Sequence, residues 1–143
     1  MVSKEIINSK LANILGYIKE LEPILTLEAL YLLDKKNYRD LRTLERDFQM
    51  IVDTMIEINS HFISKLKLEV PEDYANTFFV LGRSSIFPLE FAIKLSKAVG
   101  LRNKIVHKYD IIDMKKFIDD LKAGSHQFSD YINYIRKYLD GTN

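Results

Sequence analysis

The residues best suited to chemistry lie in one short segment, Arg102-Asn103-Lys104-Ile105-Val106-His107-Lys108-Tyr109. A histidine side chain can accept and donate protons near neutral pH. An arginine guanidinium forks onto phosphate oxygens and stabilises negative charge that builds up in a transition state. Arg102 and His107 together would therefore suit cleavage of an RNA phosphodiester without a metal, because the 2′-hydroxyl of RNA is itself the nucleophile.

The spacing of these residues fits a helix, but it does not by itself bring them all together. Asn103 and His107 are four residues apart and share a helical face. Arg102 and His107 lie about 140° apart around an ideal helix, so they meet only if the long arginine reaches round or the helix end frays. An arginine and a histidine five residues apart also occur by chance in many helical proteins, which leaves a purely structural role open.

Other residues with chemical potential have simpler interpretations. His61 is expected to be a packed or capping residue, and His126, beside Gly124-Ser125, is expected to be exposed. The three histidines are isolated from carboxylates at ligand-like spacing, so the sequence predicts neither a metal site nor a cofactor. Tyr131, Tyr134 and Tyr138 recur at helical spacing, which indicates a packing stripe rather than a surface that stacks on bases.

The composition indicates one α-rich globular domain spanning residues 1–143. Hydrophobic residues make up 47% and charged residues 29%, with only five glycines and three prolines in 143 residues. There are no cysteines, which excludes disulfides, thiolate metal sites and a cysteine nucleophile and fits a reducing cytosol. No signal peptide is evident, and no stretch approaches 18 uncharged apolar residues. We therefore expect a cytoplasmic protein without a membrane segment.

The net charge of +1 argues against a strong, non-specific nucleic-acid binder, which would normally be clearly basic. A single chain of this charge would hold a polyanion weakly. Binding of RNA would require a local basic patch or a second copy of the chain.

The apolar periodicity predicts an all-α, up-and-down bundle of about five helices. Ser3 and Asp113 are expected N-caps, Pro23 should kink or divide the first helix, and Gly100 should weaken the fourth. A bend is possible at Gly124-Ser125. The expected helical segments are residues 4–33 (interrupted at Pro23), 38–67, 74–81, 88–106 and 113–139. Residues 109–112 are expected to be extended or turn-like.

The segment from Ala98 to Tyr109 resembles the motif of the HepT-like ribonuclease toxins of the HEPN superfamily. Their hallmark is an arginine, a polar residue that is often asparagine, three more residues, a histidine, one residue and a tyrosine. The resemblance covers most of the chain and is strongest from Tyr38 to Leu121. Three further features agree with it, namely Arg42-x-x-Glu45-Arg46, the acidic and histidine positions Asp53, Glu57 and His61, and the helix from Pro88 into Gly100. The connection from Gly82 to Phe87 fits less clearly.

The resemblance implies a homodimeric HEPN bundle that acts as a metal-independent endoribonuclease toxin in a type VII-like HEPN/MNT toxin–antitoxin system. By position, Arg102 and His107 would be the catalytic pair, Asn103 would orient them, and Tyr109 would accept AMP. The implied partners are an RNA substrate and a small MNT-type nucleotidyltransferase, the antitoxin that silences the toxin by transferring AMP to the tyrosine. A dimer would place two motifs at one cleft and double the local positive charge.

Two other interpretations remain at the level of sequence. The chain could be a non-catalytic helical module that holds a nucleotidyltransferase or a nucleotide. It could also be a plain structural dimer. Cleavage of RNA by the pure protein would separate the ribonuclease interpretation from these two.

Overall fold

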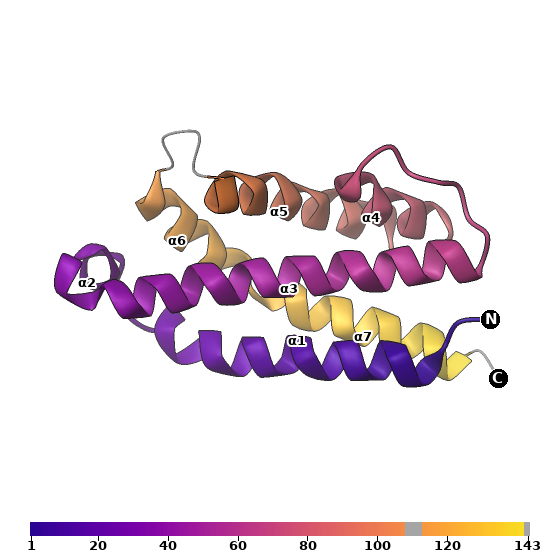
Figure 1. The fold of residues 1–143 in the computed structure, drawn as a ribbon, viewed down its shortest axis with the longest axis horizontal. Helices are drawn as coiled ribbons and strands as arrows, with labels where there is room; N and C mark the ends of the chain where they lie inside the picture. Colours follow the sequence, from indigo (N-terminus) through magenta and orange to yellow (C-terminus); the bar gives the residue numbers. More distant parts are fainter. Residues whose placement is uncertain (108–112, 142–143) are drawn as a thin grey trace.

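The computed structural model describes residues 1–107 and 113–141, and all the regular structure in these ranges is helical (Figure 1). This part of the chain contains α1 (Lys4–Leu25), α2 (Ala29–Leu33), a short 3₁₀ helix η1 (Lys35–Asn37), α3 (Tyr38–Lys65), α4 (Tyr74–Arg83), α5 (Leu89–His107), α6 (Met114–Gly124) and α7 (His126–Gly141). The predicted all-α class is confirmed. The predicted number of about five helices is wrong, since the described residues form seven α-helices. The predicted turn at residues 109–112 lies outside the described residues.

The extra helices arise because the first and last predicted segments are each interrupted. α1 runs through Pro23 and ends at Leu25, and the Thr26 hydroxyl donates a hydrogen bond to the Pro23 carbonyl at 2.7 Å. Proline has no N–H for the helical ladder and its ring clashes with the carbonyl four residues earlier, so Pro23 weakens the last turn of α1. At the other end of the chain, α6 stops at Gly124 and α7 restarts at His126, where a bend was expected.

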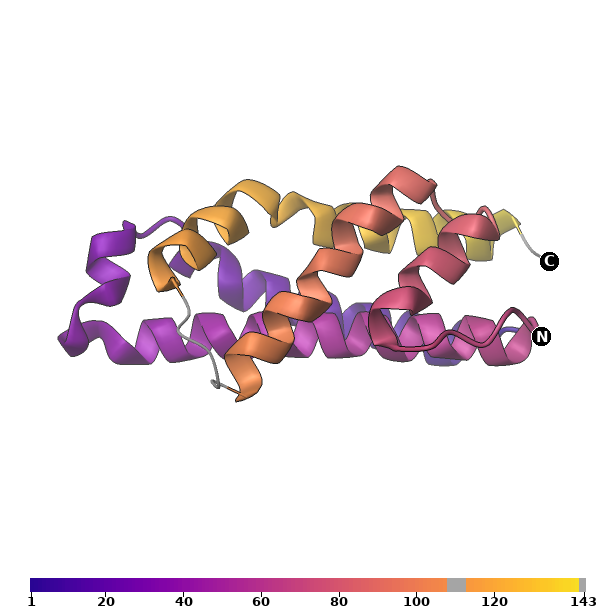
Figure 2. The ribbon, with the colours of Figure 1, turned by 90° about the horizontal axis from the view of Figure 1, so that it is seen from above.

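The 28-residue helix α3 is the spine of the molecule and is about 42 Å long. α1 packs along it in the antiparallel sense, and α4 and α5 lie on its other side (Figure 1). Seen from above, α5 crosses α3 obliquely (Figure 2). The C-terminal half of α5, which carries residues 102–107, therefore lies over the middle of α3.

The core forms along the apolar stripe that the sequence of α3 predicts. Its residues Leu44, Phe48, Ile51, Val52, Met55, Ile58 and Phe62 are all buried. Tyr131 on α7 is fully buried and donates its phenolic hydrogen to Asn59 Oδ1 at 2.7 Å. Tyr134 packs on Phe91, and Tyr138 packs on Phe62. The three tyrosines are thus a packing stripe, as predicted.

A glycine allows α4 and α5 to approach closely. A Cβ built on Gly82 would lie 2.9 Å from the Cβ of Ala92 and 3.3 Å from the Cα of Leu89. Atoms of this kind cannot come so close without a shift in the backbone. The absence of a side chain at Gly82 therefore allows the start of α5 to pack directly against α4, and this contact helps to set the path of α5 toward α3.

The other local predictions have mixed outcomes. Ser3 and Asp113 cap their helices, because their side chains accept hydrogen bonds from the N–H groups of Ile6 and Lys116. Gly100 lies within α5 and does not interrupt it. Within residues 1–107 and 113–141, no helix has a stretch long and apolar enough to cross a membrane.

Candidate active site

Arg102 takes a core-facing position on α5. The buried residues Leu95 and Val99 precede it by seven and three positions, and buried Ile105 follows three positions later. These spacings bring all four side chains to one side of a helix, so Arg102 is turned toward α3 instead of toward solvent. An arginine in such a place is stable only when a carboxylate or other acceptors meet its charge.

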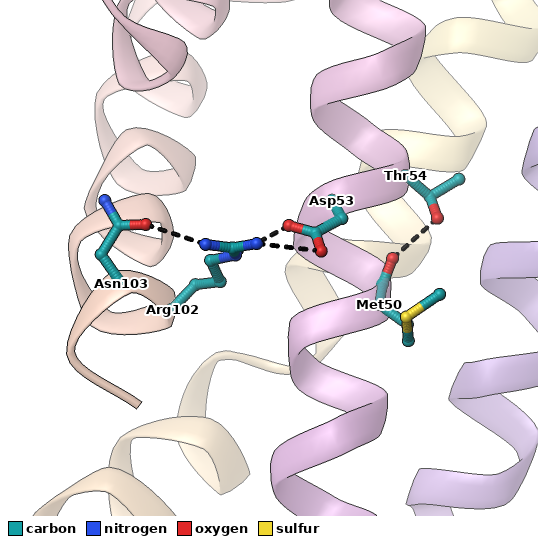
Figure 3. A network of polar contacts seen from close by, with 5 residues as sticks. All are labelled: Met50, Asp53, Thr54, Arg102 and Asn103. Carbon is teal, nitrogen blue, oxygen red and sulfur yellow. Dashed lines mark hydrogen bonds and ion pairs between the residues drawn. The ribbon is translucent and has the colours of Figure 1, made fainter. Parts of the chain in front are cut away.

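Asp53 of α3 provides that carboxylate (Figure 3). Arg102 Nε donates to Asp53 Oδ1 at 2.7 Å, and an Nη atom donates to Oδ2 at 3.2 Å. The two side chains are only 23% and 28% exposed. A two-pronged contact of this kind fixes the plane of the guanidinium as well as its position.

Asn103 adds a third contact to the guanidinium. Its Oδ1 accepts a hydrogen bond from the other Nη atom of Arg102 at 3.2 Å (Figure 3). The amide nitrogen of Asn103 points away from Arg102 in this arrangement. Because an arginine has five N–H donors, these three contacts still allow Arg102 to meet the oxygens of a phosphate. The structure therefore brings Arg102 and Asn103 together, and the orienting role of Asn103 stays a prediction.

His107 lies at the end of α5, five residues beyond Arg102, and its side chain is exposed. It is not among the described residues that line the cleft in front of Arg102. The helix continues unfrayed through His107, so the angular separation from Arg102 that an ideal helix imposes persists in this structure. Tyr109, the predicted AMP acceptor, lies outside the described residues.

Arg102 opens onto a cleft of about 620 Å³ between α1, α3, α4 and α5. Its described lining is Lys10, Asp53, Ile56, Glu57, Ser60, His61, Tyr74, Arg102 and Asn103. Lys10 pairs with Glu57 at 2.7 Å, so each of the two cations in the cleft faces a carboxylate on α3. The cleft is open to solvent.

His61 is engaged in this cleft as a structural acceptor. The Ser3 backbone N–H donates to His61 Nε2 at 3.1 Å, which requires that nitrogen to be unprotonated. Burial, followed by the charges of Lys65, Lys10 and the N-terminal amine, lowers the pKa of His61 below its ordinary value. The predicted packing or capping role of His61 is confirmed, because it ties the start of α1 to α3.

Sequence patterns had missed the two ion pairs that organise the cleft. Asp53 and Glu57 were noted as acidic positions without a role, and Lys10 was not noted. The need for a carboxylate could have been predicted from the sequence, because Arg102 interrupts the apolar stripe of α5 and its charge requires an acceptor on the side of α5 that faces the core. What no periodicity could supply is the crossing of α5 over α3, which decides that the partner is Asp53.

No group of three or more histidine, cysteine, aspartate or glutamate side chains that could hold a metal ion occurs within residues 1–107 and 113–141.

Comparison with known proteins decides the family. The family model described as "Ribonuclease HepT-like" matches residues 14–135. The chain belongs to the ribonuclease HepT-like family. The predicted family is thereby confirmed across nearly the whole bundle.

Two curated members of the HepT-like family are similar in sequence. The tRNA nuclease HepT of Aphanizomenon flos-aquae is 35% identical over 95 residues, which are 66% of this chain and 65% of that protein. The mRNA nuclease HepT of Shewanella oneidensis is 22% identical over 132 residues, which are 92% of this chain and 97% of that protein. The match to the first relative thus spans slightly less than two thirds of its length.

A solved structure supports the HepT-like fold. The tri-AMPylated HEPN toxin of Shewanella oneidensis, in complex with its MNT antitoxin, superimposes with a TM-score of 0.84. It is 21% identical, and the alignment covers 94% of this chain and 99% of that chain. At this level of identity the likeness establishes a shared HEPN fold.

Proposed function

We propose that this protein is a metal-independent endoribonuclease toxin of an HEPN/MNT-type toxin–antitoxin system. The observation that carries the proposal is the oriented Arg102, held by Asp53 and Asn103 in a cleft, in a chain of the ribonuclease HepT-like family. The two curated relatives are a tRNA nuclease and an mRNA nuclease, which supports RNA as the substrate class.

In the proposed reaction, the 2′-oxygen of a ribose attacks the adjacent phosphorus and the bond from phosphorus to the 5′-oxygen breaks. His107 takes the proton of the 2′-hydroxyl and returns a proton to the departing 5′-oxygen. Arg102 donates hydrogen bonds to the non-bridging oxygens, where negative charge builds up. Asp53 and Asn103 keep the guanidinium in one plane, so little reorganisation is needed when RNA binds. The products are a 2′,3′-cyclic phosphate and a 5′-hydroxyl.

The angular separation of Arg102 and His107 requires the RNA to pass over the end of α5. Arg102 faces the cleft above α3, and His107 lies on the exposed face one and a half turns further along. A homodimer with residues 102–109 of both copies near the two-fold axis shortens this gap, because each phosphate can meet groups from either copy. The dimer also doubles the positive charge offered by a chain of net charge +1.

The test of this function is to incubate the purified chain with RNA in EDTA and to analyse the ends of the fragments. We expect cleavage that leaves 2′,3′-cyclic phosphate and 5′-hydroxyl ends. Fragments with 3′-hydroxyl and 5′-phosphate ends would exclude attack by the 2′-hydroxyl. Stable RNA with unchanged binding of an antitoxin would instead favour a non-catalytic binding module.

We propose further that an MNT-type nucleotidyltransferase antitoxin silences the protein by transferring AMP to Tyr109. The tri-AMPylated state and the MNT partner of the Shewanella toxin support this form of regulation. The Tyr109 oxygen would attack the α-phosphorus of ATP with release of pyrophosphate. The phosphate left on Tyr109 would then compete for Arg102, since charge-assisted bonds to phosphate are strong.

The modification is tested by incubating the protein with the partner enzyme, ATP and Mg²⁺ and weighing it by mass spectrometry. We expect AMP-sized mass gains that include Tyr109, together with loss of nuclease activity. A Tyr109→Phe protein that AMP transfer still silences would rule out Tyr109 as the controlling acceptor.

A further inference from the structure

A second groove lies on the side of α5 that faces α6 and α7, outside the cleft that holds Arg102. It has a volume of about 530 Å³, and its apolar floor is formed by Phe48, Leu95, Leu101, Leu121 and Phe128. Its polar rim carries Lys94, Lys97, Lys104 and Lys116, with Asp120 and Gln127. We call this the lysine groove.

The lysine groove is basic in a chain that is almost neutral. Lys116 pairs with Asp120 at 2.8 Å, which balances one of its four positive charges. No ion pair in the described part of the chain involves Lys94, Lys97 or Lys104. Three positive charges on one helix therefore face solvent beside an apolar floor, while the whole chain has a net charge of only +1.

These lysines continue along α5 from the candidate active site. Lys104 precedes His107 by three residues, so the two lie on neighbouring parts of the exposed helix surface. From Lys104 back to Lys94 the helix rises about 15 Å. A strand whose reacting phosphate lies at the end of α5 can thus continue directly into the lysine groove.

The groove also leaves the helix backbone open between its lysines. Gly100 lies between Lys97 and Lys104, and a Cβ built on Gly100 would have nothing within 4 Å. No packing among the described residues requires a glycine there, although glycine weakens a helix by about 1 kcal/mol relative to alanine. An open backbone position between cations gives the flat face of a base or a sugar room to approach.

We infer that the lysine groove binds the single-stranded RNA that flanks the cleaved phosphate. Lysines spaced along the rim would meet successive phosphates, and the apolar floor with Gly100 would receive a base. Positively charged tracks beside apolar or aromatic surfaces are how proteins hold single strands without reading their sequence. This inference rests on the proposed ribonuclease function and assigns the groove as the part of the enzyme that holds substrate outside the reacting bond.

The direct test measures binding of a 2′-O-methyl oligoribonucleotide of about 12 nucleotides, which lacks the attacking hydroxyl and so cannot be cleaved. The variant is Lys97→Gln/Lys104→Gln. The matched control is Lys4→Gln/Lys19→Gln, which removes the same charge from α1, on the other side of α3 from α5 (Figure 1). Each lost phosphate contact should lower the slope of log K against log salt by about 0.7, or about 1.4 for the pair.

We expect the groove variant to bind roughly 10- to 30-fold more weakly at about 0.1 M salt, and the control to bind within about threefold of the parent. Circular dichroism should show the same helical content in all three proteins. Equal losses in variant and control would overturn the inference, since the effect would then be one of total charge. Unchanged RNA binding with lost antitoxin binding would also overturn it and assign the groove to the partner protein.

A second pair of variants changes charge at one position without changing shape. Gly100→Glu and Gly100→Gln both fit the open space, but the glutamate also pairs with Lys104 four residues later. We expect Gly100→Glu to bind the oligonucleotide at least fivefold more weakly than Gly100→Gln. Equal affinities would contradict the groove as a phosphate track.

The outcomes also separate the groove from the ribonuclease function itself. If the parent protein cleaves RNA and the lysine variant binds like the parent, the groove inference fails and the function stands. If the parent neither cleaves RNA nor binds the oligonucleotide, both fail.

Discussion

At the scale of residues, the central feature is an arginine that is held ready for use. A guanidinium that is pinned at Nε and both Nη atoms by Asp53 and Asn103 has few conformations left to lose when a phosphate arrives. Preorganisation of this kind accelerates reactions, because the reacting groups are already in position and lose little conformational entropy. The same carboxylate also repels the phosphate, so Asp53 should trade affinity for rate.

Asp53→Asn tests that trade. We expect kcat for RNA cleavage to fall roughly tenfold, because the guanidinium is no longer clamped, while the KM for RNA falls as a negative charge leaves the cleft. The matched control is Glu57→Gln, which removes the same charge one turn further along α3 but contacts Lys10 and not Arg102. A Glu57→Gln protein with the same loss of kcat would contradict a specific positioning role for Asp53.

The sequence was enough to single out candidate site residues, but it did not give their environment. The types and spacing of Arg102, Asn103 and His107 were enough to propose phosphodiester cleavage and to find the family resemblance. The contact to Asp53 was not predictable, since it joins residues 49 positions apart and depends on how α5 crosses α3. Helical periodicity gives the face of a helix on which a residue lies, but it does not give the residue opposite.

The buried carboxyl of Asp47 should make the stability of the protein depend on pH. Asp47 on α3 is fully buried, and neither of its oxygens has a hydrogen-bond partner among the described residues. Burial, and then the negative charge of Glu20, raise the pKa of Asp47 to about 6, while Arg46 acts in the opposite direction. The folded state therefore favours the protonated carboxyl more than the unfolded state does.

The pH dependence of stability follows from that shift. Because the folded pKa lies above the unfolded value of 3.8, the stabilising contribution is present below about pH 4 and is lost as the pH rises through about 6. Asp47→Asn cannot ionise, so its stability relative to the parent should increase between pH 4 and pH 7, by up to about 3 kcal/mol. Chemical denaturation of both proteins at several pH values measures this difference. Parallel pH profiles would show that Asp47 does not titrate in this range.

At the scale of elements, the helical bundle and the places where it is interrupted were predictable, but the sequence did not decide whether each interruption bends a helix or ends it. α3 begins at the predicted residue and ends two residues before the predicted end. The prediction succeeds here because the apolar stripe of α3 is long and contains neither glycine nor proline. The first and last helical segments were harder to predict, because Pro23 and Gly124 permit a break in a helix without requiring one. Packing decides these cases, as where Phe128 and Phe117 both reach Phe48 from the separate helices α7 and α6.

Two glycines within helices should respond to alanine with opposite signs. Gly82→Ala forces a Cβ to within 2.9 Å of Ala92 and should destabilise the protein by roughly 1–3 kcal/mol. Gly100→Ala meets nothing within 4 Å and should stabilise it by about 1 kcal/mol. Thermal unfolding of the two variants beside the parent tests this pair. A stable Gly82→Ala protein would mean that α4 and α5 do not approach as closely as described.

At the scale of the whole molecule, the proposed function requires a nearly neutral chain to assemble a site for a polyanion. We expect a homodimer of twice 16.7 kDa, with Val106, which is 37% exposed within the motif, close to the two-fold axis. Val106→Glu should shift the protein to monomers in light scattering. Val70→Glu changes a more exposed valine, outside α5, and should leave the dimer intact. A parent protein that is monomeric at micromolar concentration would contradict the assembly.

The central claim is that Arg102 and His107 cleave RNA, and cleavage by single variants in EDTA measures it most directly. We predict that Arg102→Ala and His107→Ala each lower the rate by 10²-fold or more, consistent with loss of charge stabilisation or of acid–base help. The matched controls are Arg83→Ala, whose arginine pairs with Glu69, and His126→Ala, whose histidine is exposed at the start of α7. Both controls should cleave RNA like the parent, and all four variants should keep its helical circular dichroism. Folded Arg102→Ala and His107→Ala proteins that cleave RNA at the parent rate would contradict the account.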